Sequence, residues 1–441
     1  MNNPATAGTA RAADAQLRAR ARHTVADLAQ CLADPETVAR TALANSAHDP
    51  ADRWSSSSLA EGHPGVALLF AELAHTKTGA PHRDTVRAHL AIGTTGLRAY
   101  PDDGIFTGVP AIIFAAHAAR HAPHDYATLL RRLDPVLDRR VRALLDAEDQ
   151  RLTAKRPGVS PRSYDVISGV TGLGRVLLAR EPVHHALLTD VLHYLIRSTA
   201  PVRAHGHTVP GWWIPESTAL HHEPARARGH FDPGLAHGIA GPLALLALAR
   251  QSGLHAQGHD EAIETIAEWL LAHRTPDGQW PALITFDQHN HHLQPPSPGR
   301  SAWCYGTPGI AHALHLAGTV LNRPSWRRCA LDALDRALAS PQKVFDNGLC
   351  HGWAGLLHLA GRVAHLSDDP RIAAHLPRLA APILDAYNPA TPFGFHTHNP
   401  RTTPRHYAGL LLGTAGIALA LHAYATNSPP TTTWDSALLL T

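Results

Sequence analysis

The segment AHGIAGPLALLALARQ, residues 236–251, shows the pattern that decides the fold of this chain. A turn of the form Gly-x-x-Gly opens a run that is apolar nearly all round, which is typical of a helix covered on every side. Comparable turns recur at intervals of about 46 to 69 residues, and the second ends in Ala111 in place of glycine. Their first residues are Gly62, Gly108, Gly169, Gly238, Gly306, Gly352 and Gly413. Such periodic self-similarity indicates a repeat protein.

Amphipathic segments alternate with these apolar runs, for example at residues 126–148, 260–274 and 324–340. An apolar inner helix, a loop and an amphipathic outer helix, repeated seven times, predict an all-α fold. The expected architecture is an α/α toroid, a double ring of inner and outer helices built from seven helical hairpins. Glycines at the turns allow the starts of the inner helices to approach one another without intervening Cβ atoms.

The repeats predict a single domain over residues 1–441, although length alone would suggest about three domains. We expect the repeat core to cover about residues 55–426. An irregular insertion is expected at about 201–233, where five prolines and a Trp-Trp pair interrupt the rhythm. Residues 1–20 and 427–441 are expected to be loosely ordered ends.

The composition excludes several classes of protein. Apolar residues make up 44% of the 441 residues, charged residues make up 17%, and the formal net charge is +3. A disordered chain has fewer apolar residues, and a dedicated nucleic-acid binder gathers its basic residues into a stripe. No run of 18 apolar residues and no N-terminal apolar signal region occur. We therefore expect a cytoplasmic protein without a transmembrane segment. The four cysteines are too few for a disulfide-built fold.

Two of the cysteines stand at the inner-helix turns of neighbouring repeats. Cys304 precedes the turn at Gly306, and Cys350 with His351 precedes the turn at Gly352. Equivalent turns of a ring face the same centre, so we expect these three side chains to converge. Two thiolates and an imidazole suit zinc, and three protein ligands leave a fourth position open, as in catalytic zinc sites. The alternative is that the cysteines are small buried side chains, which we expect of Cys31 and Cys329 in amphipathic helices.

Two further turns carry titratable groups. His237 directly precedes Gly238, and Asp165 lies four residues before Gly169. Taken alone, His237 is one of 34 histidines in a chain rich in this residue, and Asp165 is a helix cap or a turn residue. Their place at the turns predicts that both lie at the same end of the toroid as the cysteines, which makes them candidate site residues.

Four motifs of this chain closely resemble those of the lanthionine synthetase C-like (LanC) cyclases. They are SYDVISGVTGLGR, AHGIAGPLALL, RSAWCYGTPG and LCHGWAGLLHLAG, and the resemblance covers about residues 55–426. It implies an α/α toroid that binds one zinc ion. The implied activity is the addition of cysteine thiols to dehydroalanine or dehydrobutyrine in a precursor peptide, which closes lanthionine and methyllanthionine rings.

The resemblance also implies the roles of individual residues. Cys304, Cys350 and His351 match the zinc ligands of the family, and the implied catalytic residues are His237, Asp165, Arg300 and Tyr305. In such a reaction Arg300 would stabilise the enolate that forms when sulfur attacks, and His237 would deliver a proton to its α-carbon. Asp165 would either orient His237 or accept the thiol proton.

The implied partners are a dehydrated precursor peptide, a separate dehydratase and an exporter. The dehydratase is expected to be separate because the toroid accounts for the chain and no dehydratase domain precedes it. Peripheral association with a membrane through such a complex is compatible with the sequence. Three alternatives remain open: a related enzyme that adds a glutathione-type thiol to another acceptor, a non-catalytic peptide-binding scaffold, and an α/α-barrel glycosidase. A glycosidase would need paired carboxylates, and only Asp165 offers itself among the turn motifs.

Overall fold

The computed structural model describes residues 4–46, 54–76, 82–98, 100, 103–215, 226–291, 293, 298–396 and 405–441. Contacts divide the chain into two compact units. The first unit comprises Met1–Leu97, Ala118–Tyr126 and Val344–Trp434, and the second comprises Arg98–His117, Ala127–Lys343 and Asp435–Thr441. That the whole chain forms one domain stays a prediction.

The first unit is built from helices alone in its described residues. They are α1 (Pro4–Leu32), α2 (Pro35–Ser46), α3 (His63–Ala74), α4 (His82–Gly93), α15 (Trp353–Ser367), α16 (Pro370–Ala386) and α17 (Thr414–Thr426). Every residue of α3 is buried, whereas α4 and α16 bury only one face. Helix α17 contacts both α3 and α15, while α4 packs against α3 and α16 packs against α15. Inner and outer helices therefore alternate here as the hydrophobic pattern predicts.

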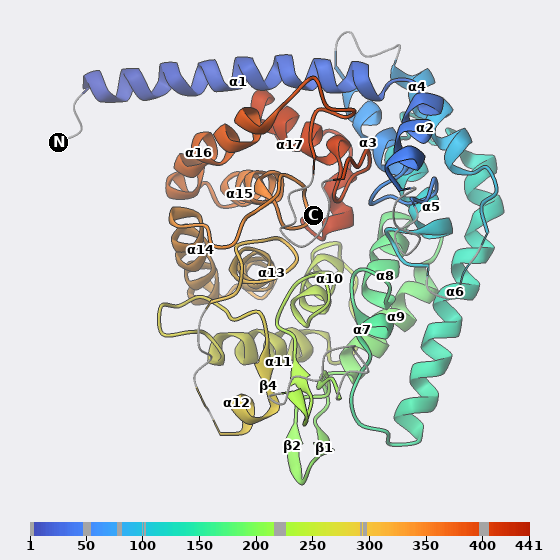
Figure 1. The fold of residues 1–441 in the computed structure, drawn as a ribbon. Coiled ribbons are helices and arrows are strands. Elements are labelled where there is room, and N and C mark those ends of the chain that lie inside the picture. The colour runs from blue at the N-terminus through green and yellow to red at the C-terminus, as the bar shows by residue number, and fades with distance from the viewer. Residues whose placement is uncertain are drawn as a thin grey trace. The chain divides into compact units, whose positions relative to one another are not determined.

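The second unit repeats this arrangement with more elements. Its helices are α5 (Gly108–Ala118), α6 (Ala127–Thr153), α7 (Pro161–Tyr164), α8 (Val170–Ala179), α9 (His185–Arg197), α10 (Ala240–Gln251), α11 (His259–Ala272), α12 (Phe286–Asn290), α13 (Thr307–Val320) and α14 (Pro324–Ala339). The apolar helices α8, α10 and α13 contact one another in that order (Figure 1). Of the amphipathic helices, α9 packs against α8 and α10, α11 packs against α10 and α13, and α14 packs against α13.

The second glycine of a turn permits a close approach between an inner helix and the segment before it. A Cβ atom added at Gly172 would lie 1.9 Å from the carbonyl oxygen of Val166, and one at Gly355 would lie 2.0 Å from that of Leu349. No side chain tolerates such distances, so these positions require glycine. The turns are thus closed by backbone packing, which holds the residues just before each helix in place.

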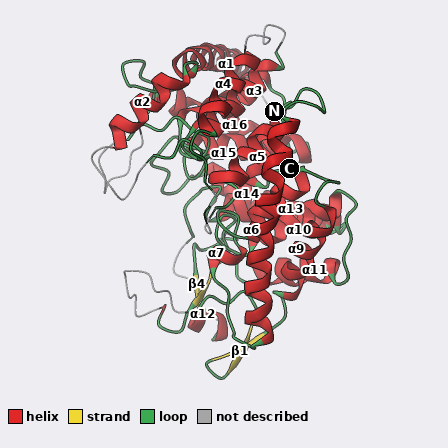
Figure 2. Ribbon diagram, turned by 90° about the vertical axis from the view of Figure 1, so that its right-hand side faces the viewer, coloured by secondary structure: helices red, strands yellow, loops and turns green. Residues whose placement is uncertain are grey.

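The predicted insertion at 201–233 is a small β-rich region of the second unit. Strands β1 (Val202–Ala204) and β2 (His207–Val209) form an antiparallel hairpin, and β3 (His230–Phe231) pairs with β4 (Ile284–Thr285). The strands and α12 gather at one end of this unit (Figure 2). Residues 216–225 of the insertion lie outside the described residues.

The prediction of loosely ordered ends is wrong for the residues that the structure describes. Residues 11–20 continue the helix α1, and the C-terminal segment, with the 3₁₀ helix η2 (Trp434–Leu438), is buried. The centroid of the Trp434 ring lies 4.4 Å from that of His358 in the first unit, and Leu438 accepts a hydrogen bond of 2.8 Å from the Trp303 ring in the second. Apolar side chains of the segment gain more from burial than its backbone loses in freedom.

The described part of the chain contains no helix that combines the length and apolar character needed to span a bilayer.

Candidate active site

Backbone hydrogen bonds join the turns of neighbouring repeats within each unit. In the second unit the amide of Val166 donates to Ala236, whose own amide donates to Cys304, at 3.0 and 3.1 Å. In the first unit the amide of Cys350 donates to Leu411 at 2.9 Å. These bonds connect residues at matching places before the inner helices. Equivalent turn positions are therefore brought side by side, as the repeat pattern predicts.

His237 and Asp165 form a close pair in the second unit. Nδ1 of His237 lies 2.6 Å from Oδ2 of Asp165, and the Asp165 side chain is only 2% exposed. The other carboxylate oxygen of Asp165 accepts hydrogen bonds of 2.8 Å from the amides of Ser168 and Gly169. Burial alone would lower the pKa of His237, but the hydrogen bond to Asp165 and the nearby negative charges raise it above its ordinary value. The pair therefore favours a protonated imidazole.

Asp232 is a second buried carboxylate beside these residues. Its Oδ1 accepts a hydrogen bond of 2.7 Å from the amide of Gly234, and its carboxylate also accepts one from the hydroxyl of Tyr305. Burial raises the pKa of Asp232 to about 6, against the opposing effect of these hydrogen bonds and of His237. Burial and the charge of Asp232 raise the pKa of Tyr305 well above its ordinary value, so its hydroxyl stays protonated. The Tyr305 ring lies beside His237, with 6.0 Å between the ring centroids.

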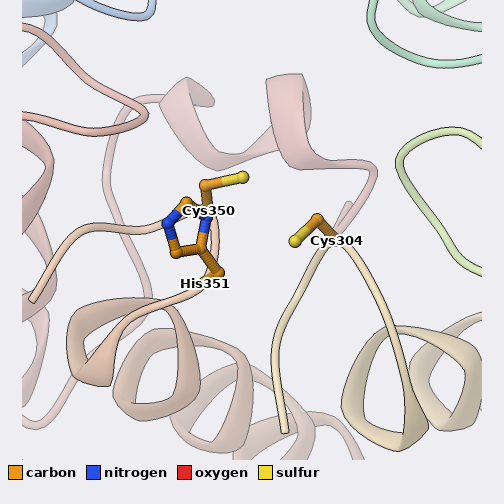
Figure 3. A group of neighbouring side chains, drawn as sticks. All are labelled: Cys304, Cys350 and His351. Atoms are coloured by element: carbon orange, nitrogen blue, oxygen red, sulfur yellow. The ribbon is translucent and has the colours of Figure 1, made fainter. Parts of the chain in front are cut away.

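Cys304, Cys350 and His351 form the group expected at the two neighbouring turns. One ligand atom of each, two sulfurs and an imidazole nitrogen, lies within 4.8 Å of the other two, and Figure 3 shows the side chains facing one another. Cys304 is buried, while Cys350 and His351 are half-buried. Two thiolates and an imidazole are the donor set that zinc prefers, so the residues present fit this metal. Cys31 and Cys329 are not part of the group.

His351 also faces a carboxylate that sequence reasoning did not single out. Nε2 of His351 lies 3.7 Å from Oδ2 of Asp346, whose side chain is 8% exposed. Oδ1 of Asp346 accepts a hydrogen bond of 2.6 Å from the amide of Gly348. Asp346 is therefore anchored to the turn and directs its second oxygen at the imidazole.

Arg300 lies four residues before Cys304 and is half-buried. Within the described residues its guanidinium forms no ion pair, and its pairing with His237 or Asp165 is not observed. The structure thus brings His237, Asp165 and Tyr305 together in the second unit, and it leaves the role of Arg300 a prediction.

Asp232 and Asp346 were missed, although an internal duplication marks both. The segment FDPGLAHGIAG at residues 231–241 matches FDNGLCHGWAG at residues 345–355. Each copy has an aspartate followed two residues later by glycine, and a histidine directly before the turn. Aligning the two copies would have identified both carboxylates. An aspartate that both histidine-bearing repeats place at the turn is a candidate for hydrogen bonding to the backbone of that turn.

Comparisons with known proteins bear on the family and the fold of the chain. The model of the family described as lanthionine synthetase C-like protein matches residues 53–439. The chain is 22% identical over 395 residues to the nisin biosynthesis protein NisC of Lactococcus lactis subsp. lactis, covering 87% of this chain and 88% of that protein. The solved structure of nisin cyclase superposes with a TM-score of 0.74 at 21% identity, covering 90% of this chain and 95% of that one. The structural likeness confirms the predicted fold class, an all-α toroid.

Proposed function

The chain belongs to the lanthionine synthetase C-like family, and from that premise we propose that it is a zinc-dependent cyclase of lanthipeptides. Its membership, with the match to the nisin biosynthesis protein, confirms the predicted family and enzyme class, a lanthionine-forming cyclase. The reaction we propose is the addition of a peptide cysteine thiol to the β-carbon of dehydroalanine or dehydrobutyrine. The sulfur–carbon bond closes a lanthionine or methyllanthionine ring, and the α-carbon gains the proton that the thiol loses.

The group of Cys304, Cys350 and His351 is the observation that carries the proposal. We assign these residues as the ligands of one zinc ion, with the fourth tetrahedral position open to the substrate thiol. A free peptide thiol has a pKa of about 8.5, and a zinc ion bound there would lower this pKa so that the thiolate forms at neutral pH.

His237 is the proposed proton donor to the α-carbon. Asp165 holds Nδ1 of the ring, which leaves Nε2 as the nitrogen that can exchange a proton with substrate. Both oxygens of Asp165 are occupied, one by two backbone amides and one by the imidazole. We therefore assign Asp165 the orienting role and not that of acceptor for the thiol proton. Its negative charge also favours the protonated form of His237.

Arg300 and Tyr305 complete the proposed machinery. The guanidinium of Arg300 is the group we assign to the enolate oxygen, which becomes negative after attack. The hydroxyl of Tyr305 donates to Asp232, and its ring lies against His237, where it limits the space open to the imidazole. The substrate we propose is a dehydrated precursor peptide, supplied by a separate dehydratase and released to an exporter, in the cytoplasm.

The first test is the zinc content of the purified, reduced protein beside that of Cys304→Ala. We expect about one tightly held zinc per chain in the wild type and none in the variant. Cys329→Ala is the matched control and should keep its zinc, because Cys329 lies outside the group.

The same proteins are then given a dehydrated precursor peptide. Ring closure leaves the peptide mass unchanged but consumes thiols, so alkylation followed by mass spectrometry measures it. Wild type and Cys329→Ala should close rings, and Cys304→Ala should not. A wild-type protein that holds no tight zinc would overturn the metal assignment. One that holds zinc but closes no ring would favour the scaffold alternative.

A further inference from the structure

We infer that Asp346 is a positioning residue that turns His351 so that its Nδ1 faces the metal. This inference rests on the proposed function, because it concerns how the chain presents one of the three zinc ligands. Asp346 touches neither substrate nor metal in this assignment, and it acts only through the imidazole.

The backbone of the turn holds Asp346 rigidly. Its carbonyl oxygen accepts a hydrogen bond of 3.0 Å from the amide of Trp353, and its Oδ1 accepts one of 2.6 Å from the amide of Gly348. A Cβ atom added at Gly352 would lie 2.5 Å from the Asp346 carbonyl oxygen, so the turn is closed tightly around this residue. Since one carboxylate oxygen is anchored and the side chain is buried, the direction of Oδ2 is determined by the turn.

That second oxygen lies on one side of the His351 ring. Nε2 is 3.7 Å from Oδ2, which is ion-pair range and too long for a hydrogen bond. Figure 3 shows one ring nitrogen on the side of the two cysteine sulfurs and the other on the far side. With Nε2 turned to the carboxylate, Nδ1 is the nitrogen left for the metal.

Histidines that bind a metal usually donate their other N–H to a carboxylate or carbonyl, which orients the ring and selects the tautomer. Removing such a partner typically lowers metal affinity about 10- to 100-fold. A neutral side chain at position 346 would keep the turn but lose the negative charge that stabilises the Nε2–H of His351. We therefore expect weaker zinc binding in a chain that is otherwise folded.

The duplicated segment supplies a matched control residue. Asp232 occupies the position equivalent to Asp346, and it is anchored in the same way, by the amide of Gly234 at 2.7 Å. It also accepts a hydrogen bond from Tyr305, and its neighbour His237 pairs with Asp165. Asp232 thus lies beside no imidazole that is a proposed metal ligand, although the nearby Cys304 contributes to raising its pKa.

The test compares zinc affinity in the full-length wild type, Asp346→Asn and Asp232→Asn, measured by competition with a chromogenic chelator. Asparagine keeps the oxygen that accepts from the glycine amide, so both variants should retain the fold, which thermal unfolding of the metal-free proteins checks. We expect Asp346→Asn to bind zinc about 10- to 100-fold more weakly and Asp232→Asn to change by less than about threefold. Cobalt(II) in Asp346→Asn should retain thiolate charge-transfer bands but show altered ligand-field bands, because only the imidazole is displaced.

Equal zinc affinity in wild type and Asp346→Asn would overturn the inference, and so would an equal loss in Asp232→Asn. Either result leaves the zinc assignment standing, because wild-type binding is measured in the same experiment. A wild type without zinc would overturn the metal in the proposed function and this inference with it. If Asp346→Asn is unstable, Asp346→Glu serves instead: its longer stem displaces the carboxylate while keeping the charge, and an affinity equal to wild type would again overturn the positioning role.

Discussion

Residues 231–241 and 345–355 are two copies of one turn that carry different chemistry. Both anchor an aspartate to the glycine two residues later, at 2.7 and 2.6 Å, and both place a histidine directly before an inner helix. In the first copy His237 pairs through Nδ1 with Asp165, a residue 72 positions away. In the second copy His351 faces Asp346 of its own turn through Nε2. The two turns thus differ in which ring nitrogen of the histidine lies nearest a carboxylate.

A second difference between the copies lies one residue before each histidine. Ala236 in the first copy contributes only its backbone, donating its amide to Cys304, whereas Cys350 in the second contributes a sulfur to the proposed zinc site. One substitution at an equivalent position therefore separates a turn that supports the proposed proton donor from a turn that supplies a proposed metal ligand. The comparison teaches that a repeat can keep its geometry while its chemistry diverges.

Exchanging histidine for alanine in each copy gives the largest expected effect. His237→Ala should keep about one zinc per chain and lose ring closure by about 10²- to 10⁴-fold, the usual contribution of a general acid. His351→Ala should lose both the tight zinc and ring closure. Metal analysis beside the alkylation assay distinguishes the two variants. Full activity in His237→Ala would remove this residue from the mechanism and with it the contrast between the copies.

Buried histidines that lack such a carboxylate hydrogen bond should make the protein sensitive to acid. In the first unit, Nδ1 of His63 lies 3.0 Å from Nδ1 of His89, and burial lowers the pKa of each to about 4. The ordinary value is about 6.5, so the unfolded chain binds protons before the folded one does. The free energy of unfolding should therefore not depend on these histidines above pH 6.5, and it should fall as the pH drops toward 4. The expected loss is a few kcal/mol, at about 1.4 kcal/mol per pKa unit.

Urea unfolding at pH 7, 5 and 4 measures this loss. The same series with His63→Gln and His89→Gln combined is the control, and it should show a flatter dependence on pH. An unchanged dependence in that variant would assign the acid sensitivity to other groups. The outcome sharpens the comparison because His237 is half-buried, yet Asp165 moves its pKa in the opposite direction.

Replacing Asp165, the partner of His237, should reduce ring closure less than replacing His237 itself. Asp165→Asn should keep zinc and reduce ring closure by at least about tenfold, less than His237→Ala, because the imidazole remains but loses its orientation. Asp165 raises the pKa of His237, so the variant should lose the protonated acid at lower pH than the wild type does. The alkaline limb of the pH–rate profile should move toward lower pH. A limb that stays in place would show that His237 is not the group that titrates there.

Much of the fold was predictable because its signals are local. The apolar runs after each glycine turn predicted the buried helices α3, α10, α13, α15 and α17, and the amphipathic segments predicted α6, α11 and α14. The convergence of Cys304 with Cys350 and His351 followed from their equivalent places in adjacent repeats. The buried C-terminal segment was not predicted, since Trp434 and Leu438 find their partners only in the folded chain.

The sequence by itself determined the repeat, the class of its helices and the residues proposed to bind zinc, because periodicity, turn composition and ligand chemistry are properties of short segments. Only the tertiary structure decided which carboxylate holds which histidine. Asp165 reaches His237 across 72 residues, while Asp346 serves the histidine of its own turn. Two nearly identical segments cannot reveal that choice, since it depends on how each turn is placed against its neighbouring repeat and on which carboxylate oxygens remain after the backbone amides are satisfied.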